Sequence, residues 1–137
     1  MKSILTATTL AGAAALSAGS VALADEAASR AVWERHVQAA TAGDIDAVMA
    51  DFTEESAIIT TDGVISGTAD IRRFFENLLG GLEPGALETT VSNAELTHGS
   101  VLVANFTIGA VGRTFQDTAV IRDDRFLVLT TVNYPAE

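Results

Sequence analysis

Asp117 is the residue of this sequence whose surroundings most clearly favour acid–base chemistry. It lies in a segment, residues 113–122, in which Phe115, Ala119 and Ile121 occupy alternate positions. In a β-strand these three apolar residues share one face with Asp117. A carboxyl group among apolar side chains loses hydration, which raises its pKa unless a cation or several donors hold it ionised. A bulge or a solvent-exposed strand end is the structural alternative.

His36 is the second candidate for chemistry. It lies one helical turn after Val32, close to the apolar positions of a predicted helix. A half-buried imidazole can move a proton near neutral pH, or donate a hydrogen bond to a developing oxyanion or to Asp117. The alternative is a histidine at the edge of the core with a purely structural role. His98 falls in a His-Gly turn, where we expect it to be exposed.

Composition narrows the other classes of chemistry. The chain has 137 residues, no cysteine, two histidines and a formal net charge of −10. Disulfides and thiolate chemistry are excluded, and the acidic pairs at 54–55 and 123–124 lack the ligand spacing of a calcium loop, so we expect no metal and no cofactor. Excess negative charge repels phosphate backbones and anionic lipid surfaces, so we expect neither nucleic acid nor a membrane as partner.

The first 24 residues have the pattern of a secretory signal peptide. Lys2 precedes a stretch of apolar and small residues, which closes with Ala22-Leu23-Ala24. A basic start, an apolar middle and small residues before the cleavage point predict removal just before Asp25. A retained membrane anchor and an ordinary helix of the fold are the alternatives. The sequence therefore predicts a periplasmic or secreted protein with one domain, residues 25–137.

Apolar periodicity in this domain predicts an α+β protein. Helices are expected over residues 25–42, over residues 45–52 and after a Thr68 cap. The first helix has an apolar stripe of Trp33, Val37 and Ala40. The third has an apolar stripe of Ile71, Phe74, Phe75, Leu78 and Leu79. Residues 57–61 and 64–67 flank an Asp62-Gly63 turn, which is typical of a hairpin. Strands over 87–97, 100–111, 113–122 and 125–134 are joined by short turns, which favour an antiparallel meander curved over the helices.

The last predicted strand is apolar on both faces. Phe126, Val128 and Val132 alternate on one face, and Leu127 and Leu129 lie on the other. One face can cover the core, whereas the second would expose a patch that invites association. We therefore expect a homodimer formed through the sheet face.

The order of these features resembles the SnoaL-like branch of the nuclear transport factor 2 (NTF2)-like superfamily. The resemblance rests on the corner at residues 43–48, on Phe52, on the hairpin with its Asp62-Gly63 turn, and on the helix that carries Ile71, Phe74 and Phe75. It implies a cone-shaped roll with three N-terminal helices packed on a curved, mainly antiparallel sheet. Members include ketosteroid isomerases, polyketide cyclases, dehydratases and non-catalytic binding or assembly modules, so the fold says little about the reaction.

The resemblance to the isomerases is mixed at the residues that would carry catalysis. His36 falls where those enzymes place an oxyanion-hole tyrosine, and Asp117 falls where they place a protonated aspartic acid. The position of the general-base aspartate is Thr61 here, and Asp62 lies on the opposite strand face. A threonine hydroxyl is not a base near neutral pH, so true ketosteroid isomerase activity is not expected.

Taken together, the residues and the resemblance predict an exported domain whose cone encloses an apolar pocket with His36, Thr61 and Asp117. It would bind a small apolar or carbonyl-bearing molecule and, if catalytic, would perform acid–base chemistry without a cofactor. The pocket-lining candidates are apolar and mostly aromatic: Trp33, Phe52, Ile59, Phe75, Phe106 and Phe115. The alternative function is a non-catalytic dimeric binding or assembly module of the periplasm, whose cone is filled by its own side chains.

Overall fold

The structure is a computed structural model that describes residues 24–137. The elements in this part are, in chain order, α1 (Glu26–Thr41), α2 (Ile45–Met49), β1 (Ala57–Thr60), β2 (Gly63–Ser66), α3 (Thr68–Gly80), the 3-10 helix η1 (Ala86–Thr89), β3 (Thr90–His98), β4 (Val101–Ile108), β5 (Arg113–Arg122) and β6 (Arg125–Pro135). All but the last residue of the predicted signal peptide lies outside the described residues. No helix in this part of the chain combines the length and the apolar character that crossing a membrane requires.

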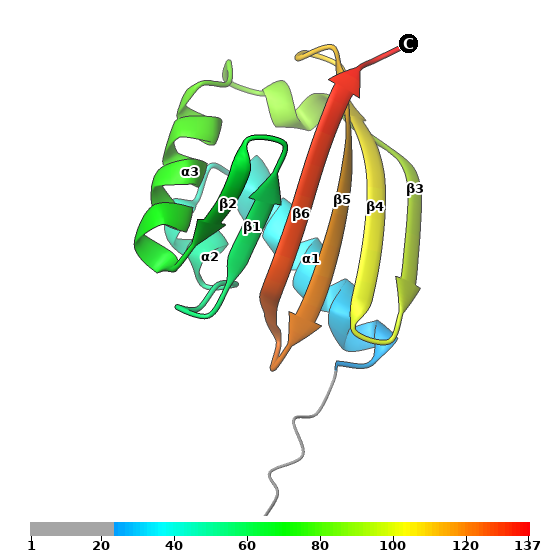
Figure 1. Cartoon of the computed structure of the whole chain (residues 1–137). Coiled ribbons are helices and arrows are strands. Elements are labelled where there is room, and N and C mark those ends of the chain that lie inside the picture. Colours follow the sequence, from blue (N-terminus) through cyan, green and yellow to red (C-terminus); the bar gives the residue numbers. More distant parts are fainter. Residues whose placement is uncertain (1–23) are drawn as a thin grey trace, which may run out of the picture.

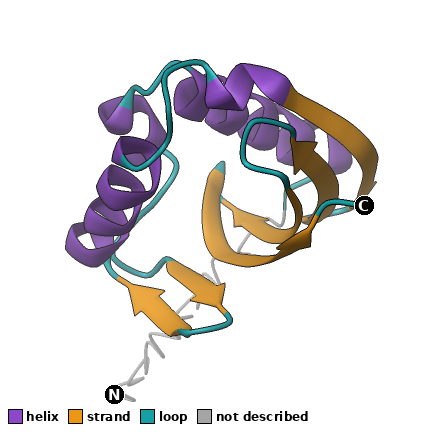
Figure 2. Cartoon of the chain, turned by 90° about the horizontal axis from the view of Figure 1, so that it is seen from above, coloured by secondary structure: helices purple, strands orange, loops and turns teal. Residues whose placement is uncertain are grey.

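The strands form one mixed sheet with the order β2-β1-β6-β5-β4-β3. Neighbouring strands are antiparallel, except that β1 runs parallel to β6. The sheet curls strongly, and the helices lie on its concave side (Figures 1 and 2). The predicted α+β class, with a hairpin, a four-strand meander and three helices on a curved sheet, is confirmed.

Local capping explains where the first two helices begin and end. The Asp25 carboxylate accepts a hydrogen bond from the Ala28 amide at 2.8 Å, and the Asp44 carboxylate accepts one from the Ala47 amide at 3.0 Å. Between them Gly43 has φ of 68°, a conformation that costs little only for glycine. The sharp corner between α1 and α2 therefore follows from these capping residues.

The face of α1 that packs on the sheet is rotated from the predicted one. Val32, Trp33, His36 and Ala39 are buried, whereas Val37 is 39% exposed. The prediction that Val37 belongs to the apolar stripe was therefore wrong. The buried residues still recur at helical spacing. Apolar residues one position earlier along the helix have the same period as the predicted ones, so spacing alone does not distinguish the two faces.

The third helix divides its apolar residues between two surroundings. Ile71 and Phe75 are buried in the core, while Phe74 is half-buried and Leu78 is 40% exposed. Spacing alone placed all of them in one stripe. The outer edge of that stripe instead faces the β1–β2 hairpin, and it forms part of the cleft described below.

The hairpin turn lies one residue earlier than predicted. Thr60 pairs with Gly63, so Thr61 and Asp62 form the turn and Gly63 begins β2. Thr60 Oγ1 accepts a hydrogen bond from the Asp62 amide at 3.1 Å and donates to the Gly63 carbonyl oxygen at 3.3 Å. Residue type alone favoured a turn at Asp62-Gly63, but the hydrogen bonds of Thr60 favour a turn at Thr61-Asp62 instead.

A bulge in the β5–β6 pair changes which side chains of β6 face the core. Ile121 pairs with Phe126 and Val120 pairs with Val128, so Leu127 is an extra residue on β6. Phe126 and Leu129 are therefore both buried, although strict alternation placed them on opposite faces of the strand. The first strand of the meander also differs from the prediction, since residues 86–89 form the 3-10 helix η1 and β3 begins at residue 90.

Candidate functional site

A half-open cleft of about 360 Å³ lies between the β1–β2 hairpin, α3 and the inner face of β5 and β6. It has the size of a small-molecule site, for which about 300 Å³ is the usual lower limit. Its lining combines hydroxyl and amide groups with aromatic and aliphatic side chains: Thr60, Thr61, Asp62, Gly63, Val64, Ile65, Phe74, Leu78, Phe115, Thr131 and Asn133. In Figure 1 the hairpin forms one edge of the sheet, and α3 lies beside it.

Asp117 is not itself among the residues that line this cleft, but it adjoins two that are. It is directly opposite Thr131 in the β5–β6 register, and Phe115 precedes it by two residues on the same face; both of these residues line the cleft. The Asp117 side chain is buried at 8% exposure, as the alternation of β5 predicted. Its Oδ1 atom is buried and has no hydrogen-bond partner within residues 24–137.

Burial changes the acidity of this carboxyl group. Loss of hydration raises the pKa of Asp117 from 3.8 to about 6, and a hydrogen bond from the Thr131 side chain partly opposes this rise. The shift has the direction that the sequence predicted. At mildly acidic pH the group is therefore a neutral acid, which can donate a hydrogen bond.

His36 lies in the core, away from the cleft lining. It is 6% exposed, and its ring makes edge contacts with the rings of Phe126, Phe75 and Phe52 at centroid distances of 4.9, 5.5 and 5.6 Å. Within the described residues no hydrogen bond or ion pair joins His36 to Asp117. The hydrogen bond from His36 to Asp117 that the sequence suggested is therefore not formed, and neither residue is among those that line the cleft.

The polar partner of His36 is Asp51, which sequence reasoning missed. His36 Nδ1 lies 3.3 Å from Asp51 Oδ2, and Arg35 Nε donates to Asp51 Oδ1 at 2.6 Å. Asp51 is 1% exposed, and its backbone carbonyl accepts a hydrogen bond from the Phe126 amide at 2.9 Å. The available signal was a single acidic residue between the apolar residues Met49 and Phe52, which is too weak to indicate a partner.

The predicted pocket residues have three different positions. Phe115 lines the cleft, and Phe106 stacks on it at a centroid distance of 5.4 Å. Phe52 and Phe75 pack around His36, and Trp33 is buried 6.4 Å from Phe106, so these three residues belong to the core.

The remaining predicted residues lie near the hairpin. Thr61 is exposed at the rim of the cleft, as its turn position requires. Ile59 is 38% exposed and absent from the cleft lining, so its prediction as a pocket residue was wrong, because Ile58 is the β1 residue that points into the core. Sequence reasoning missed Thr131 and Asn133 as cleft residues, since neither polar residue stands out in the pattern of the last strand.

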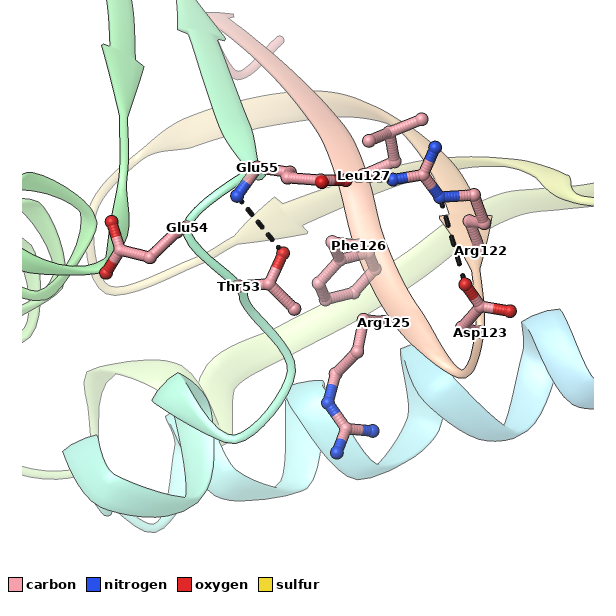
Figure 3. A pocket seen from close by; sticks show the side chains of 8 residues that line it. All are labelled: Thr53, Glu54, Glu55, Arg122, Asp123, Arg125, Phe126 and Leu127. Atoms are coloured by element: carbon pink, nitrogen blue, oxygen red, sulfur yellow. Dashed lines mark hydrogen bonds and ion pairs between the residues drawn. The ribbon is translucent and has the colours of Figure 1, made fainter. Parts of the chain in front are cut away.

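A second groove of about 330 Å³ lies between the α2–β1 loop and the β5–β6 turn (Figure 3). Its charged groups already have partners, since Arg122 contacts Glu55 and lies 4.0 Å from Asp123, Glu54 accepts from the Thr68 hydroxyl, and Arg125 donates to the Asp124 carbonyl oxygen. The Phe126 side chain in its wall is almost fully buried. No buried polar group without a partner points to a ligand here, so the cleft beside Asp117 is the better candidate site.

Comparison with known proteins supports the fold and leaves the activity open. A scan against protein-family models found no match, and a search of the curated proteins also found none. Solved structures do match. An NTF2-like protein of unknown function from Burkholderia xenovorans LB400 has a TM-score of 0.64 at 17% identity, with 82% of this chain and 86% of that chain covered.

Two further matches carry names that suggest chemistry. A protein proposed to be a ketosteroid isomerase, from Kribbella flavida DSM 17836, has a TM-score of 0.63 at 16% identity, covering 83% of each chain. A proposed polyketide cyclase from Sinorhizobium meliloti has a TM-score of 0.59 at 13% identity, covering 74% of this chain and 93% of that one. The chain therefore has the cone-shaped fold of the NTF2-like proteins, which confirms the predicted resemblance at the level of fold.

Proposed function

We propose that this protein binds a small apolar molecule bearing an oxygen in the cleft between the hairpin, α3 and β6. The observation that supports the proposal is the unpartnered, buried Oδ1 of Asp117 beside that cleft. Burying a polar atom without a partner costs free energy, so a retained one calls for an explanation, and a hydrogen bond to a ligand supplies one. Phe74, Leu78 and Phe115 offer apolar contacts to the rest of the ligand.

The chemistry open to this site is hydrogen-bond donation by a neutral carboxylic acid. Protonated Asp117 would donate to a carbonyl oxygen and stabilise negative charge that develops there, as an oxyanion hole does. Among the residues that line the cleft, Asp62 alone carries a carboxylate, and it lies in the exposed turn of the hairpin, where it is hydrated. The site therefore favours binding, or enolate-stabilising chemistry without proton abstraction by Asp117, and not ketosteroid isomerisation.

The pH dependence of binding tests this proposal. Because burial raises the pKa of Asp117 to about 6, the donor form is lost as the pH rises through that value. We expect affinity for an aromatic ketone to fall about tenfold between roughly pH 5 and pH 7, since the protonated fraction falls by that factor. Isothermal titration calorimetry on the purified protein measures this.

Two variants of Asp117 make the result specific. Asp117→Asn keeps a donor at every pH, so its affinity should be high and independent of pH, whereas Asp117→Ala should bind weakly throughout. If wild-type affinity does not change across this pH range, or if both variants behave alike, Asp117 is not the donor.

A non-catalytic dimeric module is the second candidate function. The observation that favours it is the aromatic cluster of Phe52, Phe75 and Phe126 around His36, which fills the part of the cone that a larger ligand would need. Apolar side chains on the outer face of the sheet would then serve association with a second copy. Failure of any apolar carbonyl compound to raise the melting temperature would favour this second function.

Export to the periplasm or the medium is part of the proposal. It rests on the signal-peptide pattern of residues 1–24. Cleavage before Asp25 would leave α1 whole, because that helix begins at Glu26 and Asp25 is its N-cap. Mass spectrometry of the protein isolated from its native cell envelope or medium tests this, since a mature N-terminus at Asp25 is the expected result and an uncleaved chain would contradict it.

A further inference from the structure

The Asn133 side chain presents a fixed hydrogen-bond donor at the rim of the cleft. Asn133 lies on β6 opposite Phe115, two residues beyond Thr131, and it lines the cleft. Arg113, at the start of β5, donates from Nε to Asn133 Oδ1 at 2.5 Å and from Nη2 to the Asn133 backbone carbonyl oxygen at 3.4 Å. The two side chains are diagonal neighbours on the sheet, a separation that long side chains span.

These contacts determine which way the amide faces. A guanidinium group has donors only, so the amide oxygen must face Arg113 and the Nδ2 group must face away from it. The contact with Arg113 is the only side-chain hydrogen bond that Asn133 makes within residues 24–137. Within residues 24–137 the two N–H donors of Nδ2 therefore have no partner, in a residue that lines the cleft.

Arg113 also has an uncompensated charge. Every ion pair found between residues 24 and 137 uses a basic residue other than Arg113. Its positive charge therefore polarises the Asn133 amide, which makes Nδ2 a stronger donor. A ligand amine or ammonium group would meet two donors here, and the acceptor oxygen of Asn133 already accepts from Arg113.

We propose that Asn133, held in place by Arg113, is a specificity-determining residue that selects apolar molecules with an acceptor oxygen at the rim of the cleft. The acceptor is a ketone or carboxylate oxygen attached to an apolar ring system, which packs on Phe74 and Phe115. This inference rests on the proposed function, because it needs a ligand in the cleft. Asn133 contacts the ligand, and Arg113 is a positioning residue that acts through Asn133.

A matched set of probes tests the inference. 2-Acetylnaphthalene and 2-ethylnaphthalene differ only in a carbonyl in place of a methylene group, and 2-naphthoate supplies the carboxylate form. With the wild-type protein we expect both oxygen-bearing probes to bind roughly three- to tenfold more tightly than 2-ethylnaphthalene, the range that one net hydrogen bond supports. Comparing the ketone with the carboxylate shows which source of the acceptor oxygen the site prefers.

Asn133→Asp isolates the donor. The substitution keeps the side-chain shape and an oxygen for Arg113, but it replaces the Nδ2 group with an acceptor. We expect 2-ethylnaphthalene to bind as before and the ketone to lose only the part of its advantage that Asn133 supplies, because Asp117 is unchanged. We expect 2-naphthoate to bind more weakly to the variant than to the wild-type protein because of charge repulsion. Asn133 is exposed, so the variant is not expected to affect folding.

Variants of Arg113 test the positioning role through the ratio of ketone to hydrocarbon affinity, which a purely structural effect would not change. Arg113→Gln should reduce the ratio because the amide is free to rotate, and Arg113→Lys should largely restore it. Adding Arg113→Gln to Asn133→Asp should reduce the ratio no further, since the two residues act as one unit.

The possible failures are distinguishable. If the ketone and the hydrocarbon both bind and Asn133→Asp leaves their ratio unchanged, this inference is overturned and the proposed function stands. If no probe binds to the wild-type protein, both are overturned. If only the Arg113 variants leave the ratio unchanged, Asn133 is retained and the positioning role of Arg113 is overturned.

Discussion

At the scale of single residues, the Asp117 carboxyl lowers the stability of the folded state whenever it is ionised. Its folded pKa of about 6 lies above the ordinary value of 3.8, so the folded protein holds a proton that the unfolded chain releases between these values. Stability is therefore greatest below the lower value and is lost as the pH rises through the upper one. A binding site that depends on this group retains it at the cost of stability.

Asp117→Asn should therefore stabilise the protein at neutral pH. Because each pKa unit corresponds to about 1.4 kcal/mol, the gain in the free energy of unfolding at pH 7 to 8 should approach 3 kcal/mol. The gain should shrink towards zero near pH 4, where the wild-type group is protonated in both states. Urea denaturation at several pH values measures it, and a gain that does not depend on pH would contradict the shifted pKa.

The contact of Asp51 with His36 predicts a structural role for both residues. Asp51 accepts from Arg35 and contacts His36 while being almost fully buried. Removing one partner of a buried pair leaves the other without compensation, so Asp51→Asn and His36→Ala should each lower the free energy of unfolding by roughly 2 to 5 kcal/mol.

Ligand binding provides the control for that prediction. Neither residue lines the cleft, and none of their side-chain partners does, whereas Asp117 lies opposite the cleft residue Thr131. In the fraction that folds we therefore expect the affinity for an aromatic ketone to change by less than about twofold. If binding falls by more than the loss of folded protein explains, His36 contributes to the binding site and the prediction is contradicted.

In the candidate site, the burial of Asp117 was predictable because it depends on a single strand. Alternation of Phe115, Ala119 and Ile121 suffices to turn Asp117 inward, and the structure buries it. His36 needed more information, because the residue it meets depends on how α1 rotates and on a buried aspartate fifteen positions away. The burial of Asp117 follows from the periodicity of one strand, whereas the partner of His36 depends on tertiary packing.

At the scale of elements, the corner between α1 and α2 depends on the backbone of Gly43. Its φ of 68° suits glycine, and a Cβ built there would meet nothing within 4 Å. The cost of Gly43→Ala therefore comes from the backbone alone, and we expect a loss of about 1 to 2 kcal/mol in the free energy of unfolding.

Gly80→Ala is the matched control for that substitution. Gly80 ends α3, its Cβ would also meet nothing within 4 Å, and its φ is negative as a helix requires. Alanine there should stabilise the protein by about 0.5 to 1 kcal/mol. Thermal unfolding of both variants measures the difference, and equal effects of the two alanines would contradict the role given to the Gly43 conformation.

The elements themselves were largely predictable, whereas their fine register was not. Helical and strand periods lie within short windows, so the three helices and the meander follow from local sequence. The bulge that puts both Phe126 and Leu129 on the inner face breaks the two-residue period, and the Thr60-capped turn moves the hairpin by one residue. Such irregularities depend on a few hydrogen bonds that residue type alone does not indicate.

At the scale of the whole molecule, the outer face of the sheet supports the proposal of a homodimer. Figure 1 shows α1 behind the strands and no helix in front of β3 to β6. The β3 and β6 residues on this face include exposed Val91, Leu96, Val132 and Tyr134. In a two-fold symmetric dimer, each copy would bury this patch against the same patch of its partner.

We expect the protein to be a dimer at about 10 μM, with association that strengthens as salt is added. The salt effect follows because each copy carries a net charge of −10, and counterions screen the repulsion between two such copies. Sedimentation velocity at low and high ionic strength measures it.

Val132→Glu should weaken the dimer by at least about tenfold, because two-fold symmetry brings two added charges into one apolar interface. Val37→Glu is the matched control, since Val37 is 39% exposed and Val132 is 36% exposed, but Val37 lies on α1 at the opposite side of the sheet. If the wild-type protein is a monomer at this concentration, or if both variants change association equally, the outer face is not the interface and its exposed apolar residues must be explained in another way.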